Sequence, residues 1–475
     1  MSYGALRDEV NGFAAYLVAA GVRKGDRVAL LSPNCAEYAG AFLGTLQAGG
    51  IAAEIDYHGT NAEIEATFRK AEPVAAVVAP QHAALVEDIA ARTSRPSVIV
   101  VLDGSWSAAT RQSPAGVTFP DLTLDDTACI AFTSGTTGAP KGVVLTHGNL
   151  LANASAICES LGLTSGDSVM VVLPFCYSYG KSLLTTHLLV GGALVLSSGF
   201  TYPNVVLDQM RDESVTGFAG VPSTYASLLR RSTLRTRQLP RLRYVTQAGG
   251  AMPVAHITEL ASILGPEKKL FLMYGQTEAT ARLTILNPSD LQRKMGSIGK
   301  PIGGVTIELV KADGSPAAVG EEGEIVASGK GIMAGYWKDP EATGRVLRDG
   351  RLFTGDLATR DAEGFLTIVG RRSDLIKCGG HRVSPREIEE VLLLLPEVSE
   401  VAVLGKTDEI LGESVAAFLV AEAGMTLEAE AVRRHCRQYL AAFKVPTEVT
   451  FVSSLPKTAS GKIRRHLLKQ AAEPV

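Results

Sequence analysis

Short apolar runs alternate with helical segments through the N-terminal part of this chain, and this alternation constrains the fold most. Residues 6–20 and 37–48 carry apolar side chains at helical spacing and end at glycines. Strands separated by helices are joined by crossovers, which favour parallel pairing with helices on the sheet faces. The pattern predicts a layered α/β architecture with largely parallel sheets, whose strands are expected at residues 27–31, 74–79, 97–102, 168–173, 193–196 and 243–248.

The pattern changes after about residue 296, where short apolar runs alternate with Gly, Asp and Pro turns. These runs predict a small β-rich subdomain, a β-barrel, with strands at 296–301, 305–310, 323–328 and 365–369. Residues 370–374 interrupt the pattern, and the remainder predicts an α+β unit with helices at 385–395 and 427–440 and strands at 399–404 and 414–421. We therefore expect a large N-terminal domain (1–370) and a small, mobile C-terminal domain (371–475).

Composition and charge narrow the class of protein. With 475 residues, 46% hydrophobic and 20% charged, the chain is long enough for two or three globular units. A net charge of −3 gives no general attraction to nucleic acid or to an anionic membrane. The six cysteines are scattered without zinc-ligand spacing, which predicts reduced thiols in a cytoplasmic protein. The longest apolar stretch, 183–196, is short and interrupted, so no integral membrane segment is expected.

The segment Thr133 to Gly142 is the first that points to chemistry. It follows the apolar run 128–132 and consists almost entirely of Thr, Ser, Gly, Pro and Lys. Glycines let a backbone approach an anion closely, while hydroxyls, exposed N–H groups and Lys141 can bind phosphate oxygens. A flexible surface loop of the same composition is the alternative.

This segment is not a Walker P-loop. That motif needs Gly-Lys-Ser/Thr followed by a helix, whereas Lys141 lies between Pro140 and Gly142 and a strand resumes at Val143. The loop is therefore expected to join two strands and to surround a polyphosphate.

Three further motifs complement this loop. Tyr274-Gly275-Gln276-Thr277-Glu278 follows an apolar run and offers an aromatic ring, a hydroxyl and a carboxylate suited to Mg²⁺. Asp356, after residues 351–355, could accept hydrogen bonds from two ribose hydroxyls. An aspartate that only stabilises a turn is an equally common alternative. Residues 455–462 form a second Gly/Ser/Thr/Lys segment, for which a frayed basic tail is the alternative.

Taken together, these motifs resemble the adenylate-forming superfamily of acyl- and aryl-CoA synthetases, nonribosomal peptide synthetase adenylation domains and firefly luciferase. The resemblance extends from Ser2-Tyr3-Gly4-Ala5-Leu6, similar to the family's Thr-Tyr-x-Glu-Leu, to Lys462-Ile463-Arg464-Arg465. The order and spacing of several motifs carry it.

The resemblance implies a role for each motif in binding ATP. Thr277 would contact the α-phosphate and the acyl carboxylate, Glu278 would hold Mg²⁺, and Lys462 would bridge the attacking carboxylate and the phosphate. The other ATP residues implied are Thr133, Ser134, Gly135, Thr136, Thr137 and Lys141 at the β- and γ-phosphates, Gly249, Gly250 and Ala251 along the adenine, Tyr274 stacked on it beside Gly275 and Gln276, and Asp356 and Arg371 at the ribose and phosphate.

In this family the C-terminal domain rotates between two half-reactions, which implies a hinge and a thiol tunnel. The hinge would lie at Arg372 and Ser373, where relatives usually carry Asp or Lys; Asp374 follows and could serve instead. The tunnel for the pantetheine arm of CoA would be lined by Cys378, Gly379, Gly380 and His381.

The acyl pocket is implied by residues 173–180, which resemble the family's Leu-Pro-x-Phe-His-x-x-Gly with Tyr177 in place of histidine. Relatives that activate amino acids carry an aspartate here, whereas no acidic residue occurs between Val169 and Leu207. Lys181 could pair with a second carboxylate if it points inward, but exposure on the helix surface is the favoured expectation. The pocket walls are expected to be Tyr177, Ser178, Tyr179, Leu183, Val221, Gln247, Ala248 and Gly249, a largely apolar set that suits an aryl or medium- to long-chain acyl group.

The resemblance thus implies an ATP-dependent carboxylate–CoA ligase that uses Mg²⁺ and converts an acid, ATP and CoA to acyl-CoA, AMP and pyrophosphate. One alternative is an acyl-AMP ligase that loads the phosphopantetheine of a separate acyl carrier protein. A second is a non-catalytic nucleotide-binding protein, and luciferase-like oxidation is a remote third. We expect a monomer or homodimer.

Overall fold

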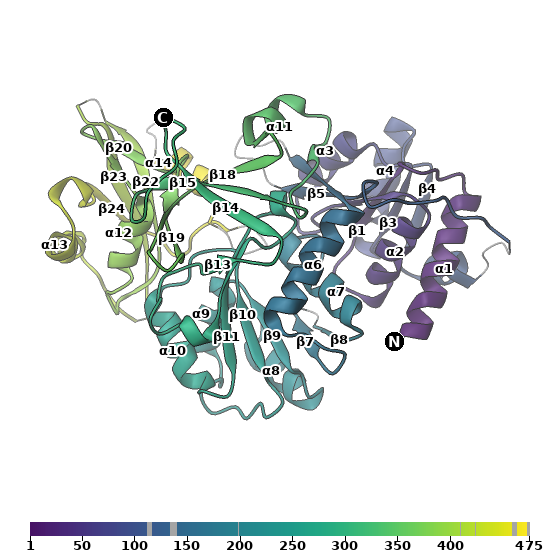
Figure 1. The fold of residues 1–475 in the computed structure, drawn as a ribbon, viewed down its shortest axis with the longest axis horizontal. Helices are drawn as coiled ribbons and strands as arrows, with labels where there is room; N and C mark the ends of the chain where they lie inside the picture. The colour runs from purple at the N-terminus through teal and green to yellow at the C-terminus, as the bar shows by residue number, and fades with distance from the viewer. Residues whose placement is uncertain are drawn as a thin grey trace.

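The computed structural model describes residues 1–111, 116–133, 140–197, 199–408, 410–422, 424–457 and 463–472. In Figure 1 the C-terminal elements lie at one end of the molecule and the N-terminal helices at the other, with two large sheets between them. Within the described ranges, no helix has the length and apolar character needed to cross a membrane.

The first large sheet is built mainly from the N-terminal residues. Five of its strands pair in parallel, as is typical of runs such as residues 28–31 that are apolar and buried on both faces. Only β5–β6 and β6–β16 are antiparallel. In order across the sheet the strands are β16 (Gly335–Tyr336), β6 (Lys141–Thr146), β5 (Thr127–Thr133), β2 (Ile51–Glu54), β1 (Arg27–Leu31), β3 (Ala75–Val78) and β4 (Val98–Val101).

The second large sheet repeats this plan. Its strands from β8 to β11 are parallel, and two short antiparallel strands close one edge. The order is β13 (Lys300–Pro301), β12 (Thr284–Leu286), β11 (Lys269–Tyr274), β10 (Tyr244–Gln247), β9 (Gly217–Gly220), β7 (Ser168–Val171) and β8 (Ala193–Leu196). The predicted α/β architecture with largely parallel sheets is confirmed.

Two helices between these sheets join them into one body. Helix α6 (His147–Leu161) contacts β6 of the first sheet, and α7 (Ser178–Val190) contacts β7 and β8 of the second (Figure 1). The Asn34 side chain also links the sheets, since it donates to the Leu173 carbonyl and accepts from the Phe175 N–H, both at 2.8 Å. The remaining N-terminal helices are α1 (Tyr3–Ala19), α2 (Ala36–Gln47), α3 (Asn61–Ala71), α4 (Ala83–Thr93), α5 (Gly104–Arg111), α8 (Pro203–Asp212), α9 (Pro222–Arg231), α10 (Val254–Leu264) and α11 (Pro340–Val346).

The predicted β-rich subdomain is present, but the described strands do not close into a barrel. Its strand pairing is an open path from β14 to β17 with β19 beside β18, because the two edge strands do not pair with each other. The strands are β14 (Val305–Val310), β15 (Gly323–Gly329), β17 (Leu347–Arg348), β18 (Arg351–Arg360) and β19 (Leu366–Arg371).

The C-terminal unit has its own sheet and its own core. Helices α12 (Pro385–Leu392) and α13 (Ala429–Tyr439) share an apolar cluster with one face, while Leu468 of α14 (Arg465–Ala472) packs on the other. The strands are β20 (Ile376–Cys378), β21 (His381–Val383), β22 (Val398–Asp408), β23 (Gly412–Ala421) and β24 (Glu448–Phe451). The domain division at residue 370 stays a prediction; β19, which pairs with β18, ends at Arg371.

Candidate active site

The phosphate-binding loop predicted from the sequence is anchored at both ends. Thr133 ends β5 and lies opposite Lys141 at the start of β6, so the segment joins two antiparallel strands, as expected. At its far end the Lys70 ammonium donates to the Pro140 carbonyl at 2.9 Å. Ser134, Gly135, Thr136 and Thr137 lie outside the described residues.

Tyr336 connects this loop to the predicted metal ligand. Its hydroxyl donates to Glu278 Oε1 at 2.7 Å, and Lys141 Nζ lies 5.3 Å from the centre of its ring. Burial and the Glu278 carboxylate raise the pKa of Tyr336, so the phenol keeps its proton and remains a donor. Sequence reasoning missed Tyr336. The available signal was the sequence Gly335-Tyr336-Trp337, a glycine followed by two aromatic residues. In the structure Gly335 has a φ of 149°, a conformation that favours glycine.

Thr277 meets the first turn of α7. Thr277 begins a short 3₁₀ turn (Thr277–Ala279) after β11, and its hydroxyl donates to Ser178 Oγ at 3.3 Å. The residue directly after β11, Gly275, must be glycine, because a Cβ there would lie 2.0 Å from the Ala281 carbonyl oxygen. Next to it, the Gln276 Nε2 is buried without a hydrogen-bond partner among the described residues. A buried amide without a partner fits a site that receives a polar ligand.

A second group of predicted residues meets around Asp356. Tyr274 donates its hydroxyl to Asp356 Oδ2 at 2.7 Å, and Arg371 Nε lies 3.2 Å from Oδ1. The pKa of the Arg371 guanidinium is raised by this carboxylate, while burial and Asp356 raise the pKa of Tyr274. Three sequence-predicted residues from β11, β18 and β19 therefore form one polar cluster.

The predicted adenine segment follows β10. Gly249 has a φ of 87°, a conformation that favours glycine, and Gln247 Nε2 donates to the Gly250 carbonyl at 2.9 Å. Ala251 is exposed and Ala248 is buried. The segment lies at the carboxyl end of its strand, the edge where α/β sheets bind ligands.

Tyr177, which replaces the usual histidine, is held by an aspartate that sequence reasoning missed. The Tyr177 hydroxyl donates to Asp56 Oδ2 at 2.6 Å. Burial would raise the pKa of Asp56, but hydrogen bonds from His58 and Tyr177 outweigh burial, so its pKa is lowered. Asp56 lies two residues beyond the end of β2, and this place after a parallel strand was the available signal.

The other predicted pocket walls lie deeper. Tyr179 is buried and donates to the Thr246 carbonyl at 2.9 Å, and Leu183 on the same helix is buried. Val221 caps the N-terminus of α9 beside Gly249. The assignment of these residues to an acyl pocket stays a prediction.

The expectation for Lys181 is wrong. This side chain is only 3% exposed and forms an ion pair with Glu54, with Cys129 Sγ at 3.3 Å from its Nζ. Burial lowers the pKa of Lys181, and the adjacent carboxylate compensates the buried charge. Sequence could not show this, because the partner lies on a strand of the other sheet.

The residues predicted to line a thiol tunnel form a tight hairpin in the C-terminal unit. Cys378 pairs with His381 across Gly379 and Gly380, whose φ values of 56° and 81° suit a two-residue turn. The His381 ring stacks on Phe443 with centroids 4.1 Å apart. Within the described residues, no hydrogen bond or ion pair joins this turn to the Glu278 or Asp356 groups.

The predicted hinge follows β19 directly. Arg372 donates its N–H to the Gly355 carbonyl at 2.8 Å and pairs with Glu324 at 3.2 Å, while Ser373 donates to Asp374 at 2.8 Å. Lys462 lies outside the described residues. Arg464, two residues later, lies 3.8 Å from Glu63 in the first turn of α3.

The residues around Glu278 fit a magnesium ion held jointly with a nucleotide. The described residues contain no group of three or more His, Cys, Asp and Glu side chains placed to hold a metal. Mg²⁺ usually takes one or two carboxylates and completes its shell with phosphates and water. Glu278 beside Lys141 provides that kind of partial site.

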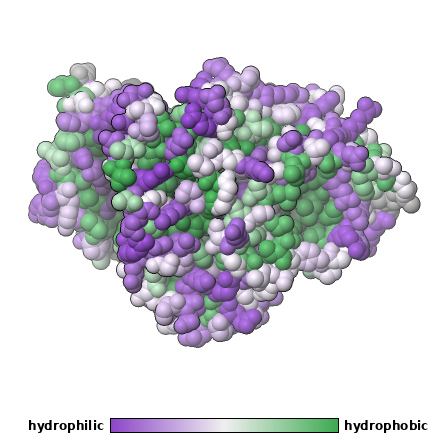
Figure 2. Space-filling view, in the orientation of Figure 1, coloured by the Kyte–Doolittle hydropathy of each residue, from purple (hydrophilic) through white to green (hydrophobic). Residues whose placement is uncertain are grey.

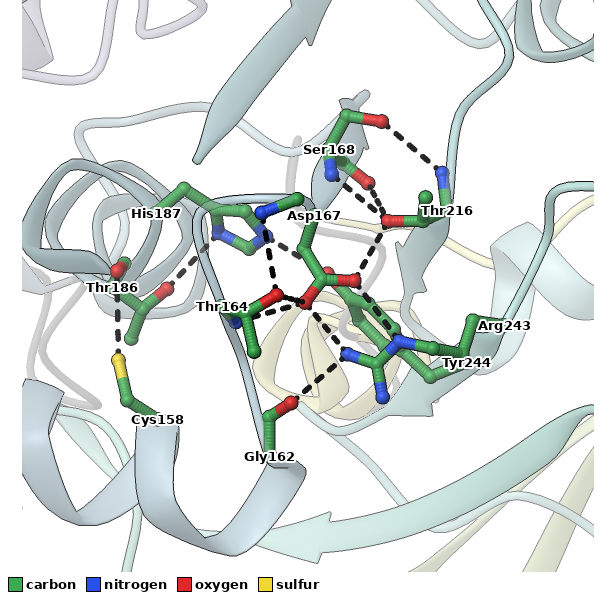
Figure 3. A network of polar contacts seen from close by, with 11 residues as sticks. Cys158, Gly162, Thr164, Asp167, Ser168, Thr186, His187, Thr216, Arg243 and Tyr244 are labelled. Atoms are coloured by element: carbon green, nitrogen blue, oxygen red, sulfur yellow. Dashed lines mark hydrogen bonds and ion pairs between the residues drawn. The ribbon is translucent and has the colours of Figure 1, made fainter. Parts of the chain in front are cut away.

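The opposite edge of the second sheet carries a polar network of another kind (Figure 3). Asp167 pairs with Arg243 at 2.9 Å and accepts from Thr216 at 3.0 Å, while His187 lies 2.8 Å from the Tyr244 hydroxyl. Asp167, Thr216 and Arg243 directly precede β7, β9 and β10 and line an open depression of about 550 Å³. Because its Arg243 and Asp167 side chains neutralise each other, the network fastens strands and offers no free charge.

Comparison with protein families gives two matches. The family model described as "AMP-binding enzyme" matches residues 1–337, and the model described as "AMP-binding enzyme C-terminal domain" matches residues 387–462.

Curated relatives match nearly the whole chain. A feruloyl-CoA synthase from Amycolatopsis sp is 35% identical over 98% of this chain and 92% of its own length. A long-chain-fatty-acid–CoA ligase from Yersinia pestis is 34% identical over 99% of this chain and 89% of its own length.

Solved structures share the fold over a similar extent. ATP-bound MatB from Rhodopseudomonas palustris superposes with a TM-score of 0.92 at 30% identity, covering 99% of this chain and 93% of that one. The o-succinylbenzoate CoA synthetase from Bacillus subtilis, solved with its acyl-adenylate intermediate, gives 0.88 at 29% identity with the same coverage.

Proposed function

Because the chain belongs to the AMP-binding enzyme family, we propose that it is an ATP-dependent carboxylate–CoA ligase acting through an acyl-adenylate on an aryl or fatty acid. One observation carries the proposal most directly. Tyr336 lies between Lys141 at the base of the phosphate loop and the Glu278 carboxylate. A cation, a phenolic donor and a candidate metal ligand held together in this way support a site for a nucleoside triphosphate.

The first half-reaction brings anions together. An oxygen of the acid attacks the α-phosphorus of ATP, and the bond to the departing pyrophosphate breaks. Mg²⁺ held at Glu278 would supply charge neutralisation in this step. Lys141 attracts the leaving phosphates, Thr277 holds the α-phosphate and the acid carboxylate, and Lys462 bridges the two reacting groups. Asp356, fixed by Tyr274 and Arg371, binds the ribose hydroxyls.

The second half-reaction transfers the acyl group to sulfur. The CoA thiolate attacks the carbonyl carbon of the mixed anhydride, and AMP leaves with the pair of electrons of the broken C–O bond. Rotation of the C-terminal domain about Arg372 and Ser373 would bring the Cys378–His381 turn to the site. Because both residues at the tip are glycines, this turn carries no side chain there.

The acceptor thiol defines the second candidate function. A separate carrier protein with a phosphopantetheine arm could replace CoA, because both present the same thiol. We favour CoA, since the curated relatives described above are named as a CoA synthase and a CoA ligase. We also propose a cytoplasmic monomer or homodimer.

Two variants test the assigned steps. Lys462→Ala is expected to abolish acyl-adenylate formation, measured as pyrophosphate release, but to spare thioester formation from supplied acyl-AMP. Gly379→Leu should block only the thiol step, because a side chain at a φ of 56° is strained and fills the turn. Equal loss of both steps in either variant would contradict the assignment.

The substrate is tested with a panel of aryl, medium-chain and long-chain acids, assayed with CoA and with a holo carrier protein. Turnover with CoA is the expected result. Turnover only with the carrier favours the second candidate, and no pyrophosphate release with any acid favours a non-catalytic nucleotide-binding protein.

A further inference from the structure

A buried guanidinium without a counter-ion lies beside the predicted acyl pocket. Arg282 follows the Thr277–Ala279 turn and is only 3% exposed. Among the described residues, no carboxylate lies within ion-pair distance of it. Its side-chain hydrogen bonds are weak: Nε donates to Met273 Sδ at 3.2 Å and Nη1 to the Ala281 carbonyl at 3.4 Å.

The two acids that contact helix α7 have partners other than Arg282. Glu54 pairs with Lys181, and Asp56 accepts from Tyr177 and His58. Burying a charge without a partner is costly, and natural proteins pair buried charges or place them where a ligand completes them. Within the described residues, therefore, no anionic group balances this guanidinium.

The position of Arg282 relative to the reacting centre indicates where that group comes from. Its guanidinium carbon lies 4.1 Å from the centre of the Tyr179 ring. Tyr179 is adjacent on α7 to Ser178, whose hydroxyl contacts Thr277. An acid whose reacting carboxylate is at Thr277 would thus extend along the first turn of α7 toward Arg282.

From these contacts we propose that Arg282 is a specificity-determining residue that pairs with a second carboxylate at the far end of the substrate acid. The planar fork of a guanidinium matches a carboxylate with two parallel hydrogen bonds, and the ring of Tyr179 supports one face of that fork. The substrate class is then a dicarboxylic acid, linear or aromatic. This inference rests on the proposed ligase function and narrows its substrate.

The test compares matched pairs of acids of equal length in pyrophosphate release by the full chain with CoA. Suitable pairs are butanoic with butanedioic, hexanoic with hexanedioic, octanoic with octanedioic, and benzoic with 1,3-benzenedicarboxylic acid. We expect kcat/KM to favour the dicarboxylic member of at least one pair by about tenfold or more. Arg282→Met should lower kcat/KM for that acid by about 100-fold and leave its monocarboxylic partner within about threefold, whereas Arg282→Lys should fall between.

Arg293→Met provides the matched control. Arg293 also lies over an aromatic ring, that of Phe365 at 5.0 Å, but it is exposed and paired with Asp290. This variant should leave the ratio between paired acids unchanged.

A binding experiment separates this inference from the ligase function itself. Calorimetry without ATP is run on the wild type and both Arg282 variants with the same acids. Tighter binding of a dicarboxylic acid that is lost in Arg282→Met supports the inference even if no acid is turned over. Equal binding of paired acids, or equal effects of Arg282→Met on both members of a pair, would overturn the inference. Arg282 would then have a structural role. Thermal unfolding of each variant identifies one that fails to fold, in which case Arg282→Lys decides by the same criterion.

Discussion

The Tyr336 hydroxyl shows how one side chain organises the proposed nucleotide site. It comes from a two-residue strand at the edge of the first sheet and reaches Glu278, which follows the second sheet. A carboxylate held by a phenolic donor is fixed in one rotamer, and such supporting contacts are what orient metal ligands. Neither residue's type reveals this contact, because 58 positions separate them.

Replacing Tyr336 by Phe removes only this donor. We expect about a tenfold loss in pyrophosphate release and a weaker apparent affinity for Mg²⁺, because the Glu278 carboxylate is then free to rotate. The melting temperature should change little, since the ring and its packing stay. Titration of activity with Mg²⁺ measures the effect. A lower rate with an unchanged Mg²⁺ dependence would contradict it, and Tyr202→Phe on the exposed surface of the second sheet's helices is the control.

Side chains show most clearly what could and could not be predicted. Tyr274, Asp356 and Arg371, which motif resemblance assigns to nucleotide binding, meet in one cluster, while their roles stay predictions. Lys181, Asp56 and Arg282 were misjudged or missed, since burial and partners depend on how distant segments pack. The residues adjacent in sequence do not show which side chains of the other sheet will be in contact.

At the scale of elements, helix α7 is anchored twice on the first sheet. Tyr177 at its N-cap position bonds to Asp56, and Lys181 one turn later pairs with Glu54 at the end of β2. These two contacts fix the helix that contributes Ser178 to the site. The anchor is electrostatic at both points, in a region that is otherwise apolar.

The buried Lys181–Glu54 pair should behave as a unit. Lys181→Met leaves the Glu54 carboxylate buried without a counter-charge, because the Tyr38 hydroxyl at 3.4 Å is a neutral donor. We expect this to cost about 3–5 kcal/mol in the free energy of unfolding. The double variant Lys181→Met/Glu54→Gln should recover most of this loss, because neither charge then remains. Urea unfolding measures all three proteins. A double variant as unstable as the single one would refute the idea.

Elements were more predictable than their pairing. Strands β1, β8 and β14 begin and end at the predicted residues, because short apolar runs between turn residues are local signals. The run at 296–301 forms only the short strand β13, since Gly296 and Gly299 have φ values of 87° and 83° that interrupt an extended chain. The open five-stranded sheet, expected as a barrel, depends on edge pairing that no local run encodes.

For the whole molecule, the network at the amino edge of the second sheet makes stability depend on pH (Figure 3). Burial lowers the pKa of His187 to about 4. An unfolded histidine titrates near pH ~6.5, so between these values the unfolded chain binds a proton that the folded chain does not. The free energy of unfolding therefore falls as the pH drops through this window.

The size of this effect is up to about 3 kcal/mol by pH ~4, and His187→Gln should remove it. Urea unfolding between pH ~4.5 and 7 measures the slope for the wild type and the variant. His435→Gln in the C-terminal unit is the control. An unchanged slope in His187→Gln would show that other groups govern acid sensitivity.

The distribution of hydrophobic and hydrophilic residues on the surface does not identify a binding partner. Figure 2 shows hydrophilic residues over most of the outline and apolar residues toward the middle of this face. Apolar atoms contribute much of any protein surface, so such a mixture by itself identifies no partner.

The Asn34 side chain joins loops of the two sheets. Because of this link, loss of enzyme activity should report separation of the sheets during denaturation. Its bonds to Leu173 and Phe175 sit immediately before α7, so separation of the sheets displaces Ser178 and Tyr177 while each sheet keeps its own strands. In a urea series, pyrophosphate release should therefore disappear at a lower concentration than the far-ultraviolet circular dichroism signal. Equal urea midpoints for activity and circular dichroism would mean that the two sheets separate only when their strands unfold. Enzyme assay would then report the earliest loosening of this protein, ahead of any spectroscopic measure of its secondary structure.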